Sequence, residues 1–572
     1  MWCKNCNIET NEKLCPICNS ETIEDLPIEV YWCDECGIPL IQITNQADKG
    51  ICPICKKKTK YLSTDLRPVF PEERFLLALL LEKDPDTYMD RSIWAANSRY
   101  YIDGKSVFLS SKTFQKADTA SIARKLSSDK RSVRYESFDT DIERFVVANK
   151  TRLDYLKDEA ITFVHKSSEK FKEENVVISF SGGKDSTVTA DIVIKAMSNP
   201  SLVHIFGNTT LEFPTTIEYA TRYREAHPLA IFQTAKNDEQ DFYDVCEDIG
   251  PPARMMRWCC SMFKTGPITR VINGMYRSQQ ILTFYGIRKS ESVSRSKYNR
   301  IENDAESVKI QQQTVASPIF FWKDVDIWLY IFAERIDFNA AYRLGYDRVG
   351  CWCCPNNNQR AQFLSRIYMP IESQKWRDFL VDFARKIGKP DSEVYVDSGK
   401  WKARQGGNGL PSAGDVKIKF ANCTTEDHAK IYRLIRPFDD ELIGMFVPFG
   451  IRAPELGMKL LHETIVLDAH TKVPILSVQP FRQDGYDYAV KVRTMNVADH
   501  DDLQRTVGYQ IRKFNACRKC LKCESLCRVG AISIIGDTYY IDPDKCVHCK
   551  MCMTAKYLDG GCMMDKYLRT KG

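Results

Sequence analysis

The chain has 572 residues, of which 44% are hydrophobic and 27% charged, and its formal net charge is +6. This length suggests three to five domains, and the composition excludes a disordered, collagen-like or coiled-coil chain. The longest apolar stretch, Phe75 to Leu81, is far shorter than the ~20 residues of a membrane helix. Because no charged-then-apolar leader follows Met1, we expect a cytoplasmic protein with reduced thiols and no membrane partner.

Cysteine is the residue type that stands out, with 23 in the chain. Reduced cysteines at tight spacing are metal ligands by default. Within residues 1–60 they form two zinc-ribbon patterns of four thiolates each, although a rubredoxin-type iron site has the same ligands. Such modules bind nucleic acid or protein, or only staple a small fold. The first pattern comprises Cys3, Cys6, Cys15 and Cys18, and the second Cys33, Cys36, Cys52 and Cys55.

Residues 61–150 change character and predict an accessory α/β region. A strand or loop from Asp65 leads into a helix that is capped near Pro71. Asp103-Gly104 lies between two alternating runs and predicts a hairpin. Apolar residues at three-to-four spacing predict a helical stretch from about 139 to 171.

A phosphate-binding loop is predicted at Ser181-Gly-Gly-Lys-Asp-Ser186. It follows a buried-type strand, 176–180, and precedes a helix over 187–197, and two further strands are predicted over 202–206 and 281–285. Gly182 and Gly183 let the backbone N–H groups face an anion, and the helix start adds its positive dipole end. Lys184 and the hydroxyls of Ser181 and Ser186 can complete the cradle. The plainer alternative is a glycine turn with a serine N-cap.

This loop resembles the PP-loop of the ATP pyrophosphatase superfamily, and the segments after it resemble the branch that contains adenylyl-sulfate and phosphoadenylyl-sulfate (PAPS) reductases. Phe206-Gly-Asn-Thr-Thr-Leu-Glu-Phe-Pro-Thr resembles that branch's nucleotide-facing loop, which implies nucleotide contacts from Asn208 and Thr209. Tyr285-Gly-Ile-Arg resembles its substrate loop, which implies that Gly286 and Arg288 lie near anionic groups. The resemblance implies a Rossmann-like parallel sheet with an adenine nucleotide at the carboxyl ends of its strands.

A second candidate site lies within the same region. The pair Cys259-Cys260 and, about ninety residues later, the two end residues of Cys351-Trp-Cys-Cys354 supply four thiolates, enough for a [4Fe–4S] cluster. The pattern resembles the adenylyl-sulfate reductases that carry such a cluster, which implies Cys259, Cys260, Cys351 and Cys354 as ligands. Cys353 can replace a ligand, carry sulfur, or do neither. Buried structural cysteines and a zinc site are the alternatives.

The C-terminal cysteine runs resemble a two-cluster bacterial ferredoxin, in which the fourth cysteine of each run ligates the other cluster. Arg528 replaces the usual proline, and nine residues rather than three separate Cys552 from Cys562. The resemblance implies one [4Fe–4S] cluster on Cys517, Cys520, Cys523 and Cys562, and a second on Cys546, Cys549, Cys552 and Cys527.

These patterns predict an α/β protein with small cysteine-rich modules. The expected domains are two zinc-ribbon motifs (1–60), an accessory α/β region (61–150), a PAPS-reductase-like PP-loop domain (151–400), an accessory α+β region (401–505) and a two-cluster ferredoxin-like domain (506–572).

Three functions are compatible with the sequence. The favoured one is an ATP-using sulfur transferase, in which Lys184, Asp185 and Arg288 act with Mg²⁺ and the acceptor is a tRNA, a DNA or a small molecule. The second is reduction of adenylyl sulfate or PAPS to sulfite, with an external electron donor or reductase supplying the ferredoxin domain. The intact loop favours ATP, and the reductases' Glu-Cys-Gly tail is not present. The third is an electron-transfer or nucleic-acid-binding subunit with a degenerate nucleotide site.

Overall fold

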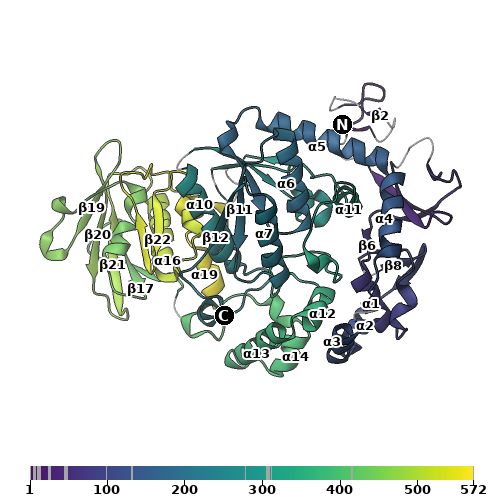
Figure 1. Ribbon diagram of the computed structural model, residues 1–572. Coiled ribbons are helices and arrows are strands. Elements are labelled where there is room, and N and C mark those ends of the chain that lie inside the picture. The colour runs from purple at the N-terminus through teal and green to yellow at the C-terminus, as the bar shows by residue number, and fades with distance from the viewer. Residues whose placement is uncertain are drawn as a thin grey trace.

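The computed structural model describes residues 2–3, 8–9, 14–22, 27–43, 49–97, 99–129, 133–276, 279–303, 310, 312–413, 416–558 and 560–570, without the side chains of 2–3 and 8–9. Its centre is a six-stranded sheet in the order β12-β11-β10-β13-β15-β14, flanked by further sheets on both sides (Figure 1). No helix in these ranges is long and apolar enough to cross a membrane.

The central sheet is parallel except at its edge, where β14 pairs antiparallel with β15. The predicted α/β class is therefore confirmed. The predicted strands at 176–180 and 281–285 form with those bounds, whereas the strand predicted over 202–206 runs over residues 203–208. The strands are β10 (Val176–Phe180), β11 (Val203–Asn208), β12 (Ile231–Lys236), β13 (Ile281–Tyr285), β14 (Ile301–Glu302) and β15 (Gln313–Ala316).

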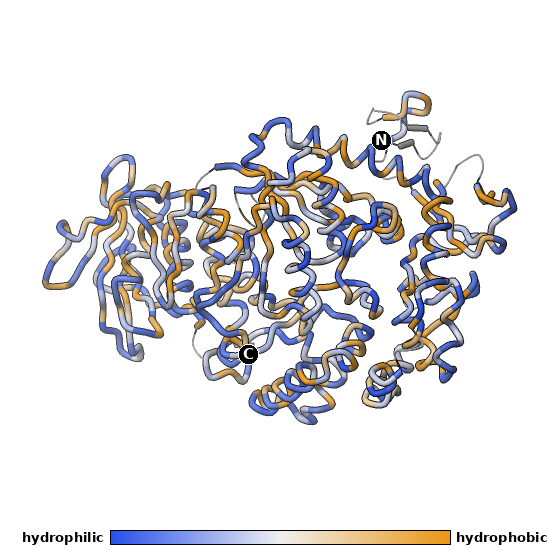
Figure 2. Tube along the Cα trace, in the orientation of Figure 1, coloured by the Kyte–Doolittle hydropathy of each residue, from blue (hydrophilic) through white to orange (hydrophobic). Residues whose placement is uncertain are grey.

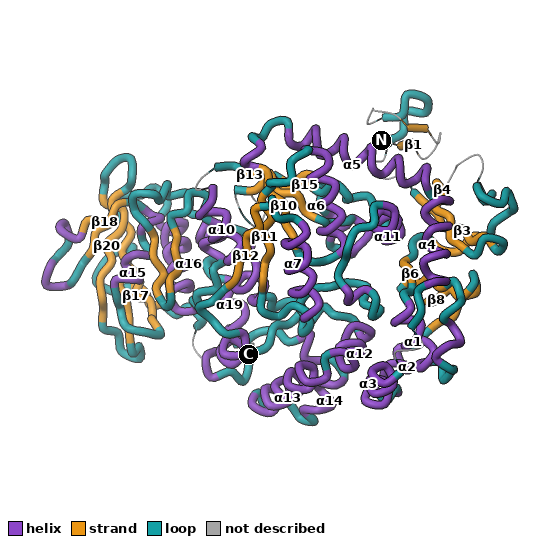
Figure 3. The backbone as a smooth tube through the Cα atoms, in the orientation of Figure 1, coloured by secondary structure: helices purple, strands orange, loops and turns teal. Residues whose placement is uncertain are grey.

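Helices cover both faces of this sheet, as Figure 3 shows. Alternate residues of a strand point to opposite faces, so Ile178 and Phe180 pack under α6 and α7, whereas Val177 and Val203 pack under α10. Hydrophobic residues accordingly follow the strands, as the tube coloured by hydropathy shows (Figure 2). The helices of this region are α5 (Lys150–Ser168), α6 (Lys184–Met197), α7 (Pro214–Ala226), α8 (Phe242–Ile249), α9 (Trp258–Cys260), α10 (Gly266–Tyr276), α11 (Asp324–Ala333), α12 (Gln359–Tyr368), α13 (Pro370–Lys386) and α14 (Ser392–Asp397).

The N-terminal part contains small antiparallel sheets and helices. The predicted hairpin forms between β8 and β9, and the predicted helix begins at Pro71. The helical stretch predicted from about 139 to 171 is two helices, because Asn149 ends α4 and uses its side chain to hold β4. The strands are β1 (Trp2–Cys3), β2 (Ile8–Glu9), β3 (Ile28–Cys33), β4 (Ile38–Ile43), β5 (Lys60–Ser63), β6 (Arg67–Pro68), β7 (Ile93–Ala96), β8 (Arg99–Ile102) and β9 (Lys105–Phe108), and the helices are α1 (Pro71–Leu80), α2 (Ser111–Lys116), α3 (Thr119–Ser128) and α4 (Glu136–Ala148).

The C-terminal part has a second six-stranded sheet, which is antiparallel and ordered β16-β17-β21-β20-β19-β18. Helix α16 leads from it into the cysteine-rich tail, which lies between this sheet and the central one (Figure 1, yellow). The strands are β16 (Phe420–Asn422), β17 (Ala429–Leu434), β18 (Ile451–Ala453), β19 (Thr464–Leu467), β20 (Pro474–Phe481), β21 (Tyr488–Thr494), β22 (Ile532–Ile535) and β23 (Thr538–Ile541), and the helices are α15 (Asp440–Gly444), α16 (His500–Ala516), α17 (Lys522–Leu526), α18 (Met551–Thr554) and α19 (Met563–Leu568).

Candidate functional site

The predicted phosphate loop joins the carboxyl end of β10 to the start of α6. Helix α6 begins at Lys184, three residues earlier than predicted, so its first N–H groups belong to the loop itself. The hydroxyl of Ser186 donates to the Gly183 carbonyl at 2.8 Å and accepts from the Ser181 amide at 3.2 Å. Ser186 therefore shapes the loop in this structure, while Ser181 is exposed at its rim.

Two glycines of the site are required by close packing. Gly182 has a φ of +70°, and a Cβ atom there would lie 2.8 Å from Cγ2 of Thr216. A Cβ atom on Gly286 would lie 2.6 Å from the backbone carbonyl oxygen of Asp185. Gly182 therefore lets the phosphate loop lie against α7, and Gly286 lets the segment after β13 lie against the phosphate loop.

Lys184 and Arg288 meet in a buried group of charges at this edge of the sheet. The Lys184 ammonium lies 3.1 Å from Oδ1 of Asp324, and Nη2 of Arg288 lies 2.8 Å from the same oxygen. Arg288 also donates from Nε to Asp185 at 2.5 Å. Both cations are almost fully buried.

The carboxylate of Asp185 is stabilised in its charged form by these neighbours. Burial raises the pKa of Asp185, but the charges of Arg288 and Lys184 outweigh that effect and lower it to about 2. Two fixed cations and an ionised carboxylate at the N-terminus of α6 can bind the phosphates of a nucleotide together with a divalent cation.

The loop after β11 connects this edge to the central cysteines. The Thr209 hydroxyl lies 3.4 Å from Sγ of Cys351 and donates to Glu212 at 2.6 Å. The Asn208 side chain accepts from the Thr210 amide at 2.9 Å, which fixes the turn. Because β11 neighbours β10 in the sheet, Asn208 and Thr209 lie beside the phosphate loop.

The central cysteines come together on short segments next to this loop. Cys259 and Cys260 lie on α9, and Cys351 pairs with Glu212 in an isolated antiparallel bridge. A hydrogen bond from the Cys259 thiol and the charge of Arg257, whose Nη2 lies 3.4 Å from Sγ of Cys260, lower the pKa of Cys260. The four thiols predicted as ligands interact electrostatically: Cys259, Cys260, Cys351 and Cys354.

Cys353 is more deeply buried than Cys351 and Cys354. It is 5% exposed and packs in the apolar cluster that contains Trp376 and Leu380. Burial raises the pKa of its thiol well above the usual value. Of the three roles left open for Cys353, a buried core residue fits this environment.

The C-terminal cysteines gather near one another, although among the described residues only Cys33, Cys36, Cys52 and Cys55 form a set with all sulfurs within 4.8 Å. Burial and the charges of Cys517, Cys520 and Cys523 raise the pKa of Cys562 well above its usual value, so Cys562 lies beside the first run despite the longer spacing. The other group lines one small cavity: Cys527, Cys546, Cys549 and Cys552. The two [4Fe–4S] clusters expected on these cysteines stay a prediction.

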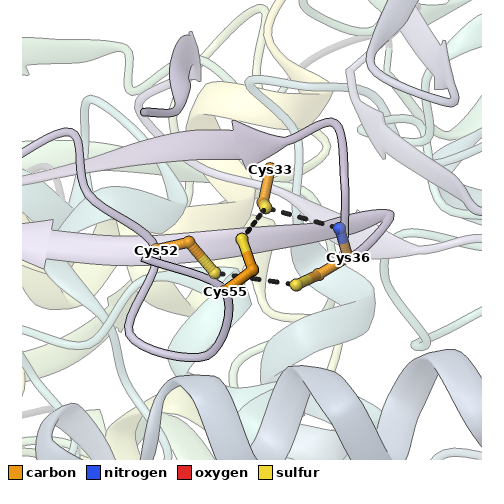
Figure 4. Close-up of side chains that lie close together, drawn as sticks. All are labelled: Cys33, Cys36, Cys52 and Cys55. Carbon is orange, nitrogen blue, oxygen red and sulfur yellow. Dashed lines mark hydrogen bonds between the residues drawn. The ribbon is translucent and has the colours of Figure 1, made fainter. Parts of the chain in front are cut away.

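Near the N-terminus, four thiols stand close enough to hold a single metal ion (Figure 4). The Sγ atoms of Cys33 and Cys55 lie 3.4 Å apart, and those of Cys36 and Cys52 lie 3.8 Å apart. A tetrahedral zinc ion with Zn–S bonds of ~2.3 Å separates its sulfurs by about 3.8 Å. Of the other predicted set, Cys15 is buried and Cys18 exposed, whereas Cys6 and the side chain of Cys3 lie outside the described residues.

Sequence reasoning missed several residues of the phosphate site. The Tyr342 hydroxyl accepts from the Lys184 amide at 3.0 Å, and the Asp347 carbonyl accepts from its ammonium at 3.2 Å. Asp324 is the first residue of α11 and lies within the region 151–400 that is expected to resemble the reductases. Asp65 accepts from the Asp324 amide at 3.0 Å across 259 positions, and nothing local in the sequence indicates that contact.

Comparisons with known proteins match the region that holds both sites. Residues 175–357 match the family described as phosphoadenosine phosphosulfate reductase domain. An uncharacterised protein of Methanocaldococcus jannaschii is 31% identical over 268 residues, which are 47% of this chain and 54% of that protein. The chain thus spans about half the length of this relative.

Two further similarities concern reductases. The adenosine 5′-phosphosulfate reductase of Staphylococcus haemolyticus is 26% identical over 188 residues, which are 32% of this chain and 70% of that enzyme. The crystal structure of phosphoadenylyl-sulfate reductase from Candida auris has 17% identity and a TM-score of 0.28, and covers 36% of this chain and 97% of its own.

Proposed function

We propose that the chain is an iron–sulfur enzyme that binds an adenine nucleotide at the carboxyl edge of its central sheet and uses it in sulfur chemistry, with ATP as the favoured nucleotide. One observation carries the proposal: the Thr209 hydroxyl, in the loop next to the phosphate site, contacts a cysteine of the central thiol group. The nucleotide's phosphates and the group held by the central cysteines would then react in one site.

In the ATP reaction an acceptor oxygen attacks the α-phosphorus. A bond forms between that oxygen and phosphorus, the bond to the bridging oxygen breaks, and pyrophosphate leaves with Mg²⁺. Lys184, Arg288 and the first N–H groups of α6 hold the negative charge in place, so catalysis is mostly positioning and charge stabilisation. Asp185 supplies an oxygen ligand of the type that Mg²⁺ prefers. A sulfur nucleophile then displaces AMP from the acceptor, which is a tRNA, a DNA or a small molecule.

The second candidate is reduction of adenylyl sulfate or PAPS, and one further observation favours it. The C-terminal module packs on α10, just after Cys259 and Cys260, with Thr269 donating to Ser525 at 3.1 Å and Arg270 to Glu524 at 3.1 Å. Iron–sulfur clusters bound to the central cysteines and to the two C-terminal sets of cysteines would supply one-electron transfer. Two electrons break the sulfur–oxygen bond of the sulfated nucleotide and release sulfite and the nucleoside phosphate.

An anaerobic assay with a low-potential reductant separates the two reactions. ATP is supplied in one tube and adenylyl sulfate or PAPS in another, and pyrophosphate and sulfite are measured. We expect pyrophosphate from ATP and no sulfite. Lys184→Ala should lower the rate at least a hundredfold, because it removes the buried cation. Lys195→Ala, on the same helix but outside the site and paired with Asp191 and Glu334, should leave it unchanged.

The alternative outcomes are equally specific. Sulfite from the sulfated nucleotide would replace the ATP reaction by the reductase. Neither product, together with no binding of ATP, adenylyl sulfate or PAPS, would contradict both enzymes and favour an electron-transfer or nucleic-acid-binding subunit.

A further inference from the structure

Helix α11 lacks a cap of its own at the end that faces the phosphate site. The residue at its N-cap position is Lys323, and a lysine side chain has no hydrogen-bond acceptor. The first N–H groups of a helix need acceptors from elsewhere. The carboxylate of Asp326 accepts from the Lys323 amide at 2.9 Å, which leaves the amides of the first turn, among them those of Asp324 and Val325.

Asp65 satisfies both of those amides from a distant part of the chain. Its Oδ2 accepts from the Asp324 amide at 3.0 Å and its Oδ1 from the Val325 amide at 3.0 Å. Asp65 lies between β5 and β6, outside the sheet that carries the phosphate loop. The helix start that bears Asp324 is therefore fixed by the region 61–150.

The side chain of Asp324 is the acceptor shared by the two buried cations of the phosphate site, Lys184 and Arg288. A shift of the first turn of α11 would move that carboxylate and, with it, both cations. Positioning errors of this kind are costly, because phosphate binding depends on the placement of fixed charges.

A second contact from the same region acts on Lys184 by another route. Arg67 donates from Nε to Asp347 at 2.6 Å and binds Glu73 through two hydrogen bonds of 2.6 and 2.8 Å. The backbone carbonyl of Asp347 accepts from the Lys184 ammonium. Arg67 and Glu73 are both buried, so this contact is part of a fixed network rather than a surface ion pair.

We propose that the segment from Asp65 to Glu73 is a positioning element of the nucleotide site, and that Asp65 acts as an external cap of α11 that places Asp324 against Lys184 and Arg288. This inference rests on the proposed function, since it assumes that the nucleotide's phosphates bind at these cations. It assigns to the accessory region a part in nucleotide binding. Asp65 itself is a positioning residue and is not expected to touch the nucleotide.

The test uses the full chain and measures the affinities of Mg·ATP and of adenylyl sulfate by calorimetry. Asp65→Ala removes both acceptors, and the loss of a cap corresponds to about a tenfold change in an equilibrium constant. We therefore expect about tenfold weaker binding of the nucleotide that the wild type binds. Asp84→Ala is the matched control, because Asp84 also caps a helical turn of the accessory region, accepting from the Asp86 amide at 3.0 Å, and is exposed.

A rescue variant separates positioning from general stability. Lys323 has the extended backbone of an N-cap residue, with φ −88° and ψ 170°, so Lys323→Ser can cap α11 locally. In the double variant D65A/K323S we expect most of the lost affinity to return. If D65A does not fold, Asp65→Asn, which keeps one acceptor, takes its place with the same expected direction.

The possible results distinguish this inference from the function on which it rests. Equal affinity of D65A and wild type, or no recovery in the double variant, would overturn the inference and leave the proposed function standing. A wild type that binds neither ATP nor adenylyl sulfate would overturn the proposed function, and the inference with it.

Discussion

At the scale of single residues, His204 is a fully buried histidine in the strand that leads to the nucleotide loop. Its Nδ1 lies 2.9 Å from the Leu202 carbonyl oxygen and its Nε2 lies 3.2 Å from the Tyr223 hydroxyl. Burial lowers the pKa of His204 to about 4. The ring is therefore neutral in the folded chain at a pH where an exposed histidine carries a proton.

The stability of the central sheet should consequently depend on pH. Above the unfolded pKa of ~6.5 both states hold a neutral ring; as the pH falls from there to about 4, only the unfolded state takes up the proton. We expect protonation of this residue in the unfolded state to lower the free energy of unfolding by about 3 kcal/mol over that pH interval. The measurement is the urea midpoint at pH 7, 5.5 and 4.5, where His204→Gln should lose less stability on acidification than wild type. A parallel loss in both proteins would exclude His204 as the cause.

A buried cation lies on the helix that leads into the cysteine-rich tail. Lys513 is on α16, is 0% exposed, and donates its ammonium to the Cys552 carbonyl. The thiols that interact electrostatically with it come from both C-terminal groups: Cys517, Cys523, Cys552 and Cys562.

A fixed positive charge between two clusters favours their more negative, reduced states. We therefore expect Lys513→Met, which keeps the length of the side chain, to lower the reduction potentials of the proposed C-terminal clusters in an EPR-monitored redox titration. Lys556→Met, an exposed lysine of the same module, should leave them unchanged. Equal potentials in K513M and wild type, with equal iron content, would rule out this role.

At the scale of elements, the local sequence pattern predicted the fully buried strands and the tight turn. The buried runs at 176–180 and 281–285 became β10 and β13, and the turn at Asp103-Gly104 became a hairpin. The break between α4 and α5 was missed, because helical periodicity continues through it. Asn149 breaks the helix by bonding to the Ile41 amide at 2.7 Å, a contact that no local pattern contains.

The residues of the candidate site also fall into two kinds, those that a local motif reveals and those that only the folded chain brings together. Ser181 to Ser186 and Gly286 to Arg288 carry recognisable motifs, because glycine is needed where two backbones touch. Asp65 and Asp347 have no motif, since their roles arise only when separate parts of the chain fold against the phosphate loop. A sequence therefore shows which loop binds phosphate more readily than which residues hold that loop in place.

At the scale of the whole molecule, the C-terminal module is held firmly against the central domain. Arg270 on α10 pairs with Glu524 at 3.1 Å and with Glu239 at 2.7 Å, and it also donates to the Ile534 carbonyl. A Cβ atom on Gly266 would lie 2.5 Å from Leu521, so the two backbones approach closely there. The Ser261 hydroxyl contacts Met563 at the same junction. Cys520 and Cys562 share an apolar cluster with Cys353 here, and Cys259 and Cys351 pack against the same cluster.

Weakening this contact should separate nucleotide binding from reductant-driven turnover. Arg270→Ala leaves the buried carboxylate of Glu524 beside Glu239 without its cation, which costs more stability than the loss of an exposed ion pair. If the chain is the reductase, we expect its reductant-driven turnover to fall about tenfold, with iron content and nucleotide affinity unchanged. Arg385→Ala, whose partner Asp382 is exposed on α13, is the control and should behave as wild type.

If R270A lost nucleotide affinity as well, Arg270 would support the central domain itself, because α10 packs directly on β11 and β12. Turnover equal to wild type would instead show that reductant reaches the central thiols without this junction.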